Sequence, residues 1–409
     1  MELFFLATTF SIMYFTARLF CKKLEAFIVT LVSASLLFMY YEGGNLSEEY
    51  AMAFIAIGLY IFIDYFINSR ISKCRLIICG FVFAGTLMLR PNMVALWVVM
   101  CVAVLLLLLQ KKLWKNIFDF ILFFMIGAML LIVPIIVWLA SNGALIQCWQ
   151  DYIVFNGEYM SAGTPEAILN NRWDCFFYFF STDIYIAVFL IQVYLCKMEK
   201  SVFHFAYLLY MLIVLLFICL SRTAFGHYGM ILVPMVVYPL ARVFSMLERI
   251  DNKFLSEVLV LLCSVYMLSS FVIPNWIELA RKVPEIYETR DESHISGTVL
   301  NISDMLDELN IGKEEPISVY GNLDLIYLAS QRPHATRYSY QFPVGQVSPR
   351  IMDEYFESLK VELPQAIVVQ FYDDAIKNFL EENDYKFVWG ENGEAEADGL
   401  LIFYRRKDS

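Results

Sequence analysis

The sequence predicts a polytopic α-helical membrane protein of about ten transmembrane helices, followed by a small C-terminal α/β domain. Three observations predict this fold class. The chain is 59% hydrophobic and 17% charged, with a mean hydropathy of +0.60, whereas soluble domains are roughly 45–50% apolar and about 25% charged. Apolar segments near the ~20 residues that cross a bilayer recur through the first 280 residues. Lysine and arginine concentrate in every second gap between these segments.

The predicted spans lie near residues 2–17, 25–41, 50–67, 74–89, 93–109, 116–140, 176–195, 203–220, 228–246 and 255–273. The fourth and fifth spans are separated only by Arg90, Pro91 and Asn92. This pair is therefore either two complete spans or a broken, re-entrant element, since polar backbone at that depth must be buried or line a cavity.

The basic gaps predict the orientation of the chain. They hold Arg18, Lys22, Lys23, Arg70, Lys73, Arg75, Lys111, Lys112, Lys115, Lys197, Lys200, Arg242, Arg249 and Lys253. The intervening gaps hold only Arg90, Arg172 and Arg222. By the positive-inside rule the first set is cytoplasmic and the second is outside. We expect a multi-pass protein of the plasma (inner) membrane with outer loops at residues 42–49, 90–92, 141–175 and 221–227.

The tail, residues 281–409, is predicted to be an extracytoplasmic domain. Basic and acidic side chains balance at 17 each through residue 280, whereas the tail has 13 basic and 24 acidic ones, so the net charge of −11 belongs to it. An acidic outer surface argues against nucleic acid as a partner. The predicted strands Pro316–Tyr320, Ala366–Gln370 and Leu400–Tyr404 alternate with helical spacing over 299–309, 351–359 and 375–380. This alternation indicates an α/β layer domain.

Two adjacent carboxylates, Glu48 and Glu49, stand in the first outer loop just before Tyr50. Carboxylates there are costly near lipid. They can accept a proton from an incoming hydroxyl, bind a divalent cation or orient a sugar. The structural alternative makes Ser47 a helix N-cap and the two glutamates first-turn acids that suit the helix dipole.

Cationic side chains occupy two further outer loops. Arg90, followed by Asn92, is suited to phosphate recognition, or else it extends along the helix towards the interface. Arg222, His227 and Tyr228 can bind an anionic lipid head group, or they form an interfacial belt. The aromatic spacing of loop 141–175 indicates an interfacial amphipathic helix, and the alternative is that its aromatic rings stack on sugars. The nine cysteines show no zinc-ligand spacing, so no metal site is predicted and no disulfide framework is expected.

These segments, in this order, resemble the bacterial polytopic glycosyltransferases of the GT-C superfamily, which includes protein mannosyltransferases and aminoarabinose transferases. The matching pieces are Gly43–Tyr50, Gly85–Asn92, Arg222 with His227 and Tyr228 before Pro234, and the outer C-terminal domain. The resemblance implies transfer of a sugar from a polyprenyl-phosphate donor at the outer leaflet to a glycan, lipid or protein acceptor of the cell envelope.

The resemblance also implies roles for individual residues. It places the donor phosphate near Arg90, Arg222 and His227, and it makes Tyr50, Asn92 and Tyr228 further substrate-binding candidates. Glu48 and Glu49 match an acidic loop of the family and are the candidate catalytic residues. No cofactor follows with certainty, and a divalent cation stays open. The expected partners are the lipid bilayer, the donor and a glycan or lipid acceptor.

One departure from the family pattern affects the catalytic base. Members normally begin with a cytoplasmic terminus, one span and a large outer loop that carries the aspartate taken as the base. Here Met1 opens directly into a span whose far end is basic, so the first span and first outer loop are expected to be missing. The chain is then a transferase with another start, an inactive or truncated one, or one that works differently.

Two other classes of function remain. A transporter or flippase of a lipid-linked saccharide would place polar residues at mid-membrane and show symmetric broken helices. Asp64 and Asp119 instead lie near the predicted cytoplasmic ends, and no inverted repeat is evident. The third candidate is a non-catalytic scaffold for other envelope enzymes.

Overall fold

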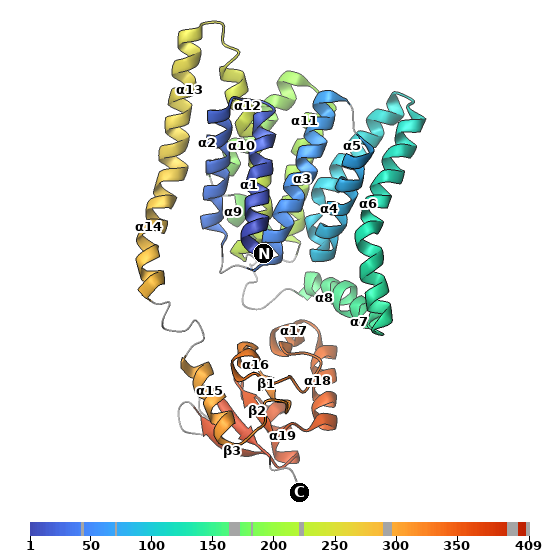
Figure 1. Ribbon diagram of the computed structural model, residues 1–409, viewed down its shortest axis with the longest axis vertical. Coiled ribbons are helices and arrows are strands. Elements are labelled where there is room, and N and C mark those ends of the chain that lie inside the picture. Colours follow the sequence, from blue (N-terminus) through green and yellow to red (C-terminus); the bar gives the residue numbers. More distant parts are fainter. Residues whose placement is uncertain are drawn as a thin grey trace. The chain divides into compact units, whose positions relative to one another are not determined.

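The computed structural model (Figure 1) describes residues 1–41, 45–69, 72–162, 172–180, 183–220, 225–288, 297–390 and 400–405. The chain forms two compact units. The first unit comprises Met1–Ile153 and Pro165–Ala280, and the second comprises Val154–Thr164 and Arg281–Ser409. Part of the predicted outer loop 141–175 therefore groups with the C-terminal residues.

The first unit is helical in all its long elements. In chain order these are α1 (Glu2–Arg18), α2 (Lys23–Ser35), η1 (Leu36–Met39), α3 (Ser47–Asn68), α4 (Lys73–Leu89), η2 (Pro91–Met93), α5 (Ala95–Gln110), α6 (Trp114–Ser141), α7 (Leu145–Cys148), η3 (Trp149–Val154), α9 (Arg172–Phe180), α10 (Asp183–Glu199), α11 (Val202–Cys219), η5 (Gly226–Val236), α12 (Val237–Leu247), α13 (Lys253–Met267), η6 (Leu268–Val272) and α14 (Ile273–Glu288). A further helix, α8 (Phe155–Ala162), belongs to the second unit.

The long helices α1 to α6 run alternately in opposite directions, which separates two ends (Figure 1). One end carries the α3–α4 and α5–α6 connections with Lys73, Lys111 and Lys115, and we call it the lysine end. The opposite end carries the start of α3 and the turn around Arg90, and we call it the Arg90 end. The alternating charge of the sequence thus becomes a spatial segregation of basic side chains.

Two glycines allow close contact between α4 and α6. A Cβ atom on Gly80 would lie 1.9 Å from the carbonyl oxygen of Phe124, and one on Gly127 would lie 1.9 Å from that of Ile77. The backbones of the two helices therefore touch directly, as small residues permit between helices in a membrane. Only Phe120, Gly127 and Ala128 of the 28 residues of α6 are buried.

Five helices of the described chain are long and apolar enough to cross a membrane on their own. They are Ser47–Asn68, Trp114–Ser141, Val202–Cys219, Gly226–Leu247 and Lys253–Pro284. The pair α9 and α10, bent by 92° at its break, makes a sixth if the two helices form one span. The protein is thus a helical, membrane-embedded chain with a small sheet, and the total of ten spans stays a prediction.

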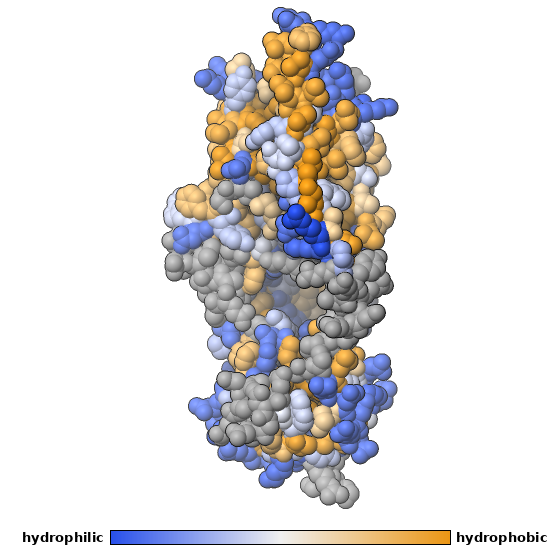
Figure 2. All heavy atoms as spheres, turned by 90° about the vertical axis from the view of Figure 1, so that its left-hand side faces the viewer, coloured by the Kyte–Doolittle hydropathy of each residue, from blue (hydrophilic) through white to orange (hydrophobic). Residues whose placement is uncertain are grey.

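The surface of the first unit is apolar over its flanks. Figure 2 shows hydrophobic side chains along the face formed by α13 and its neighbours. Phe254, Leu261 and Tyr266 of α13 are 77%, 62% and 62% exposed. Large apolar side chains in that number are stable only against another apolar phase, here the bilayer.

The last two predicted spans differ from simple α-helices. The ninth begins as a 3-10 helix, Gly226–Val236, that contains Pro234 and is mostly buried. Pro234, which offers no N–H for a helical hydrogen bond, is the third residue from its end. The tenth extends past the predicted end at residue 273, because α13, η6 and α14 continue to Glu288.

The second unit contains a four-stranded sheet in the order β1-β2-β4-β3. The strands are β1 (Ser318–Tyr320), β2 (Ala366–Val369), β3 (Lys386–Gly390) and β4 (Leu401–Tyr404). β1 pairs parallel with β2, whereas β4 pairs antiparallel with both β2 and β3. The helices are α15 (Gly297–Glu308), α16 (Leu325–Ser330), α17 (Gln341–Val347), α18 (Pro349–Glu362) and α19 (Asp374–Glu382). The three predicted strands form, and β3, α16 and α17 are additional.

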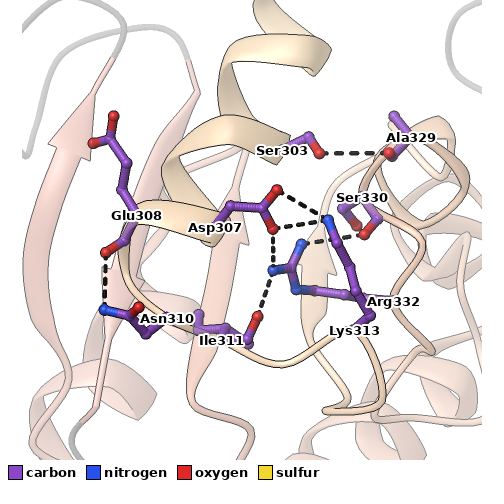
Figure 3. A network of polar contacts seen from close by, with 9 residues as sticks. All are labelled: Ser303, Asp307, Glu308, Asn310, Ile311, Lys313, Ala329, Ser330 and Arg332. Carbon is purple, nitrogen blue, oxygen red and sulfur yellow. Dashed lines mark hydrogen bonds and ion pairs between the residues drawn. The ribbon is translucent and has the colours of Figure 1, made fainter.

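A buried arginine connects α15 with the segment after α16 (Figure 3). The Arg332 side chain is 0% exposed and donates to a carboxylate oxygen of Asp307 at 2.6 Å. It also donates to the backbone carbonyls of Ser330 and Ile311, and Lys313 donates to both carboxylate oxygens of Asp307. Hydrogen bonds from Lys313 and then Arg332 hold the pKa of Asp307 below its usual value.

Candidate functional site

The first turn of α3 places two buried glutamates at the Arg90 end. Glu48 is 1% and Glu49 is 0% exposed. The helix begins at Ser47 with Leu46 as its N-cap, and the Glu49 carboxylate accepts a hydrogen bond from the Leu46 N–H at 3.2 Å. The prediction of Ser47 as the N-cap is therefore wrong, because its hydroxyl donates to the Glu48 carboxylate at 2.8 Å instead. First-turn placement of both acids is confirmed.

The turn at Arg90 follows from the proline beside it. A residue before proline is pushed out of the helical region, and Arg90 has the extended angles φ −156° and ψ 130°. α4 therefore ends at Leu89, and Pro91–Met93 form a short 3-10 turn before α5. This break places Arg90 between the end of α4 and the 3-10 turn.

Arg90 joins two segments that are far apart in the sequence. Its Nη1 lies 2.6 Å from a carboxylate oxygen of Glu48, and its Nη2 donates to the Tyr228 hydroxyl at 3.3 Å. The guanidinium carbon lies 4.7 Å from the centre of the Tyr228 ring, within the range of cation–π attraction. The Arg90 side chain is 31% exposed and that of Glu48 is 2% exposed. A half-open cation is thus held against a buried carboxylate.

The start of η5 brings Tyr228 to this position. The rings of Phe225 and His227 are stacked with centroids 5.5 Å apart, and Tyr228 contacts His227 edge to face at 4.7 Å. A Cβ atom on Gly229 would lie 2.3 Å from the Tyr40 ring. Any larger residue at Gly229 would push η5 away from that ring, so this glycine permits the close approach.

The other predicted substrate-binding residues lie in different surroundings. The Tyr50 hydroxyl donates to the Asn45 side chain at 2.5 Å, and its ring contacts Phe5 at 5.0 Å. Asn92 lies in the turn after Arg90, and its side chain makes no hydrogen bond within the described residues. Arg222 falls in 221–224, outside the described residues, as do residues 42–44 of the first outer loop. The structure brings together Glu48, Arg90 and Tyr228.

Glu2 and Tyr152 also lie near this site, and the sequence did not predict either of them as a site residue. The Tyr41 hydroxyl donates to Glu2 at 2.5 Å, and the Glu2 and Glu49 carboxyl groups interact. An acid at the predicted outer end of the first span was the sequence signal for Glu2. The Tyr152 hydroxyl donates to the Leu87 carbonyl at the end of α4, which fixes η3 beside the Arg90 turn. Tyr152 belongs to loop 141–175, for which the sequence predicts an interfacial helix or aromatic rings that stack on sugars.

The hydrogen bonds of Glu48 limit how a divalent cation can bind at this site. Both oxygens of Glu48 accept hydrogen bonds, from Arg90 and from Ser47. A divalent cation on this carboxylate would have to displace a guanidinium. In the part of the chain that the structure describes, no three His, Cys, Asp or Glu side chains are grouped to hold a metal. The Arg90 guanidinium, 31% exposed, is a group that can bind an anion such as a phosphate.

No protein-family model matches the chain, and no curated protein sequence matches it.

Proposed function

We propose that this protein is a membrane glycosyltransferase that moves a sugar from a polyprenyl-phosphate donor to a cell-envelope glycan, lipid or protein acceptor on the outer face. One observation carries the proposal. Arg90, Glu48 and Tyr228, which resemble family positions in three separate segments, form one cluster. Their end of the helices is the one that the charge pattern predicts to be outside.

Arg90 supplies the phosphate-binding group. A guanidinium has five N–H donors in a rigid fork. The hydrogen bonds to Glu48 and Tyr228 engage Nη1 and Nη2, and the side chain remains 31% exposed. The exposed side of the guanidinium is free to approach a phosphate oxygen. Positive charge there stabilises the leaving polyprenyl phosphate as the glycosidic bond to it breaks.

The two glutamates have separate roles in this proposal. Glu48 accepts hydrogen bonds from Arg90 and Ser47, so both of its oxygens are engaged and it positions Arg90. Glu49 is 0% exposed, uses one oxygen for the Leu46 N–H and interacts with the Glu2 carboxyl group. It forms no ion pair with a cation of the described chain. Glu49 is therefore the candidate base that takes the proton of the acceptor hydroxyl.

An apolar groove on the same unit fits the donor tail. It has a volume of about 360 Å³ and lies between α9 and α11, lined by Trp173, Phe176, Leu212, Leu216 and Cys219. Cys219 is the last residue of α11, after which the chain leads to Tyr228. An isoprenoid chain needs an apolar groove of this kind, with its phosphate near the helix ends.

Transfer is tested with membranes that contain the wild-type protein, Glu49→Gln, Arg90→Lys or Arg90→Met. A panel of labelled polyprenyl-phosphate sugars is supplied with envelope glycan, lipid and protein acceptors. We expect new glycosidic bonds with the wild type, and loss of transfer with Glu49→Gln and Arg90→Met. Glu257→Gln and Arg249→Met, at exposed residues near the lysine end, are the matched controls. Wild-type transfer rates in Glu49→Gln and Arg90→Met would refute the assignment.

A flippase of a lipid-linked saccharide is favoured by one other observation. Glu199, His204, Tyr238 and Arg242 form a polar network among α10, α11 and α12. His204 is 3% and Arg242 is 6% exposed, and buried ionisable groups in membrane helices mark transport pathways. Movement of a labelled lipid-linked saccharide across proteoliposomes, with no new glycosidic bond, would support this function over transfer.

A further inference from the structure

A polar cavity lies at the lysine end, opposite the Arg90 end. Its volume is about 530 Å³, and it lies where α3 and α5 end and α4 and α6 begin. Three lysines line it, Lys73, Lys111 and Lys115, together with Ser69, Ser72 and Asn116. These side chains provide three ammonium groups, two hydroxyls and one amide around a single space.

The cavity carries a net positive charge. Asp119 is the acidic residue among its lining side chains. The nearby Asp64 is already engaged by Arg75 and Asn68, so it does not neutralise the lysines. Lys73 lies over the Phe123 ring, with its ammonium nitrogen 4.6 Å from the ring centre. In the described part of the chain none of the three lysines forms an ion pair, which leaves them available to an anion.

Apolar side chains line one part of the cavity and lie beside it, which suits a lipid better than a dissolved ion. Leu76, Leu108 and Phe120 form its apolar floor. Beside it on α6, Trp114 and Phe118 are 65% and 64% exposed. Tryptophan is enriched where a membrane meets water, and basic pockets between membrane helices bind phospholipid head groups. A head group can thus enter the cavity while its acyl chains lie along the apolar surface of α6.

We propose that this cavity binds the phosphate of an anionic phospholipid head group at the membrane surface of the lysine end. The three lysines surround the phosphate, and Ser69, Ser72 and Asn116 donate hydrogen bonds to it. The site is independent of the Arg90 cluster, which lies at the other ends of α3 and α4. Bound lipid connects the four helix ends and resists their separation.

The first test uses the full-length protein in nanodiscs of phosphatidylcholine with a small fraction of phosphatidylglycerol. Lipids retained by the protein are counted by native mass spectrometry. The pocket variant Lys73→Gln/Lys111→Gln/Lys115→Gln is compared with Lys23→Gln/Lys197→Gln/Lys200→Gln. The control removes the same charge from exposed lysines at the same end of the helices. We expect the pocket variant to lose phosphatidylglycerol binding on the order of tenfold, and the control to lose less than twofold.

Equal losses in the two variants would overturn the proposal, because the attraction would then be a general property of the basic surface. Inorganic phosphate distinguishes the source of the anion. We expect it to compete weakly, at concentrations far above those of the lipid. Competition by inorganic phosphate as strong as that by phosphatidylglycerol would show a site for a dissolved anion and would refute the lipid assignment.

A second measurement needs no charge variant and so avoids any folding defect. Phosphatidylglycerol or phosphatidylcholine with brominated acyl chains quenches tryptophans that touch the chains. The contribution of Trp114 is obtained by comparison with Trp114→Phe. We expect brominated phosphatidylglycerol to quench Trp114 at least about threefold more strongly than brominated phosphatidylcholine at the same low fraction. Equal quenching by the two lipids would contradict a selective site beside Trp114.

Discussion

The Arg90 guanidinium contacts the carboxylate of Glu48 at 2.6 Å, and this contact joins the end of α4 to the first turn of α3. The glutamate side chain is 2% exposed and the arginine side chain is 31% exposed. The buried charge thus depends on a partner that remains open to a ligand. A phosphate that binds Arg90 would meet a guanidinium whose position is already fixed, which lowers the entropic cost of binding.

Arg90→Met is expected to destabilise the protein by about 3–5 kcal/mol, because it leaves the buried carboxylate of Glu48 without a cation. Glu48→Gln should cost less, since the half-open arginine can be hydrated. The double variant removes both charges and should cost less than the sum of the two single changes. The free energies come from unfolding titrations with SDS in detergent micelles. Additive costs would show that the two side chains do not depend on each other.

Tyr228→Phe is expected to change little, because the ring that contacts the guanidinium at 4.7 Å remains and only a 3.3 Å hydrogen bond is lost. We expect a stability loss below about 1 kcal/mol. Tyr228→Leu also removes the cation–π contact and should cost about 1–2 kcal/mol more. Binding of polyprenyl phosphate, followed by fluorescence, should weaken for the leucine variant alone. Equal weakening in both would assign the effect to the hydroxyl.

Gly80→Ala and Gly127→Ala are each expected to destabilise the first unit by about 1–3 kcal/mol, because the added methyl group would collide with backbone of the facing helix. SDS unfolding titrations measure the effect. Gly157→Ala is the matched control, since a Cβ atom there meets nothing within 4 Å. It should be neutral or stabilise α8 by roughly 0.5–1 kcal/mol. A similar loss in all three variants would refute the close contact of α4 and α6.

Asp307→Asn is expected to destabilise the second unit by about 1–3 kcal/mol near neutral pH, because Arg332 is buried and loses its carboxylate partner. Hydrogen–deuterium exchange of α15 in the full-length protein measures the change. Asp304→Asn is the control, as an exposed acid of the same helix. Equal exchange in the two variants would show that the ion pair adds nothing to the stability.

The same contact predicts a dependence on pH. The folded-state pKa of Asp307 is lowered, so its contribution to stability is fully present above the unfolded value of about 3.9 and is lost as pH falls through the folded value. The difference in exchange between wild type and Asp307→Asn should be constant from pH 7 to pH 5, after correction for intrinsic exchange. It should shrink below about pH 4. A difference that disappears already near pH 6 would assign the effect to another group.

The alternation of basic gaps predicted that Glu48, Arg90 and Tyr228 would share one end of the helices, and the structure places them together there. The alternation did not predict that Arg90 would bind Glu48. A charge pattern assigns each loop to a side of the membrane, but it does not tell which loops on that side are in contact. The contact of Arg90 with Tyr228 and the interaction of Glu2 with Glu49 depend on which helices are neighbours. No local pattern contains that information.

In the second unit, β1, β2 and β4 were predicted because each is a short run of mostly buried residues. β3 was missed because its five residues are partly or fully exposed, with no buried run. The 3-10 geometry of Gly226–Val236 was missed for another reason. Hydropathy measures how apolar a segment is, and an apolar 3-10 helix gives the same signal as an α-helix.

The seam between α4 and α6 has a consequence for how this chain tolerates mutation. Most side chains of α6 face outward, with only Phe120, Gly127 and Ala128 buried. Exchange of one apolar residue for another should therefore be accepted at most positions of this long helix. Substitutions should be harmful only at the residues of α6 that contact α4, such as Gly127, where an added methyl group would collide with the backbone of α4. Related chains would then keep small residues at these contact positions, while the other positions of α6 would vary among apolar residues.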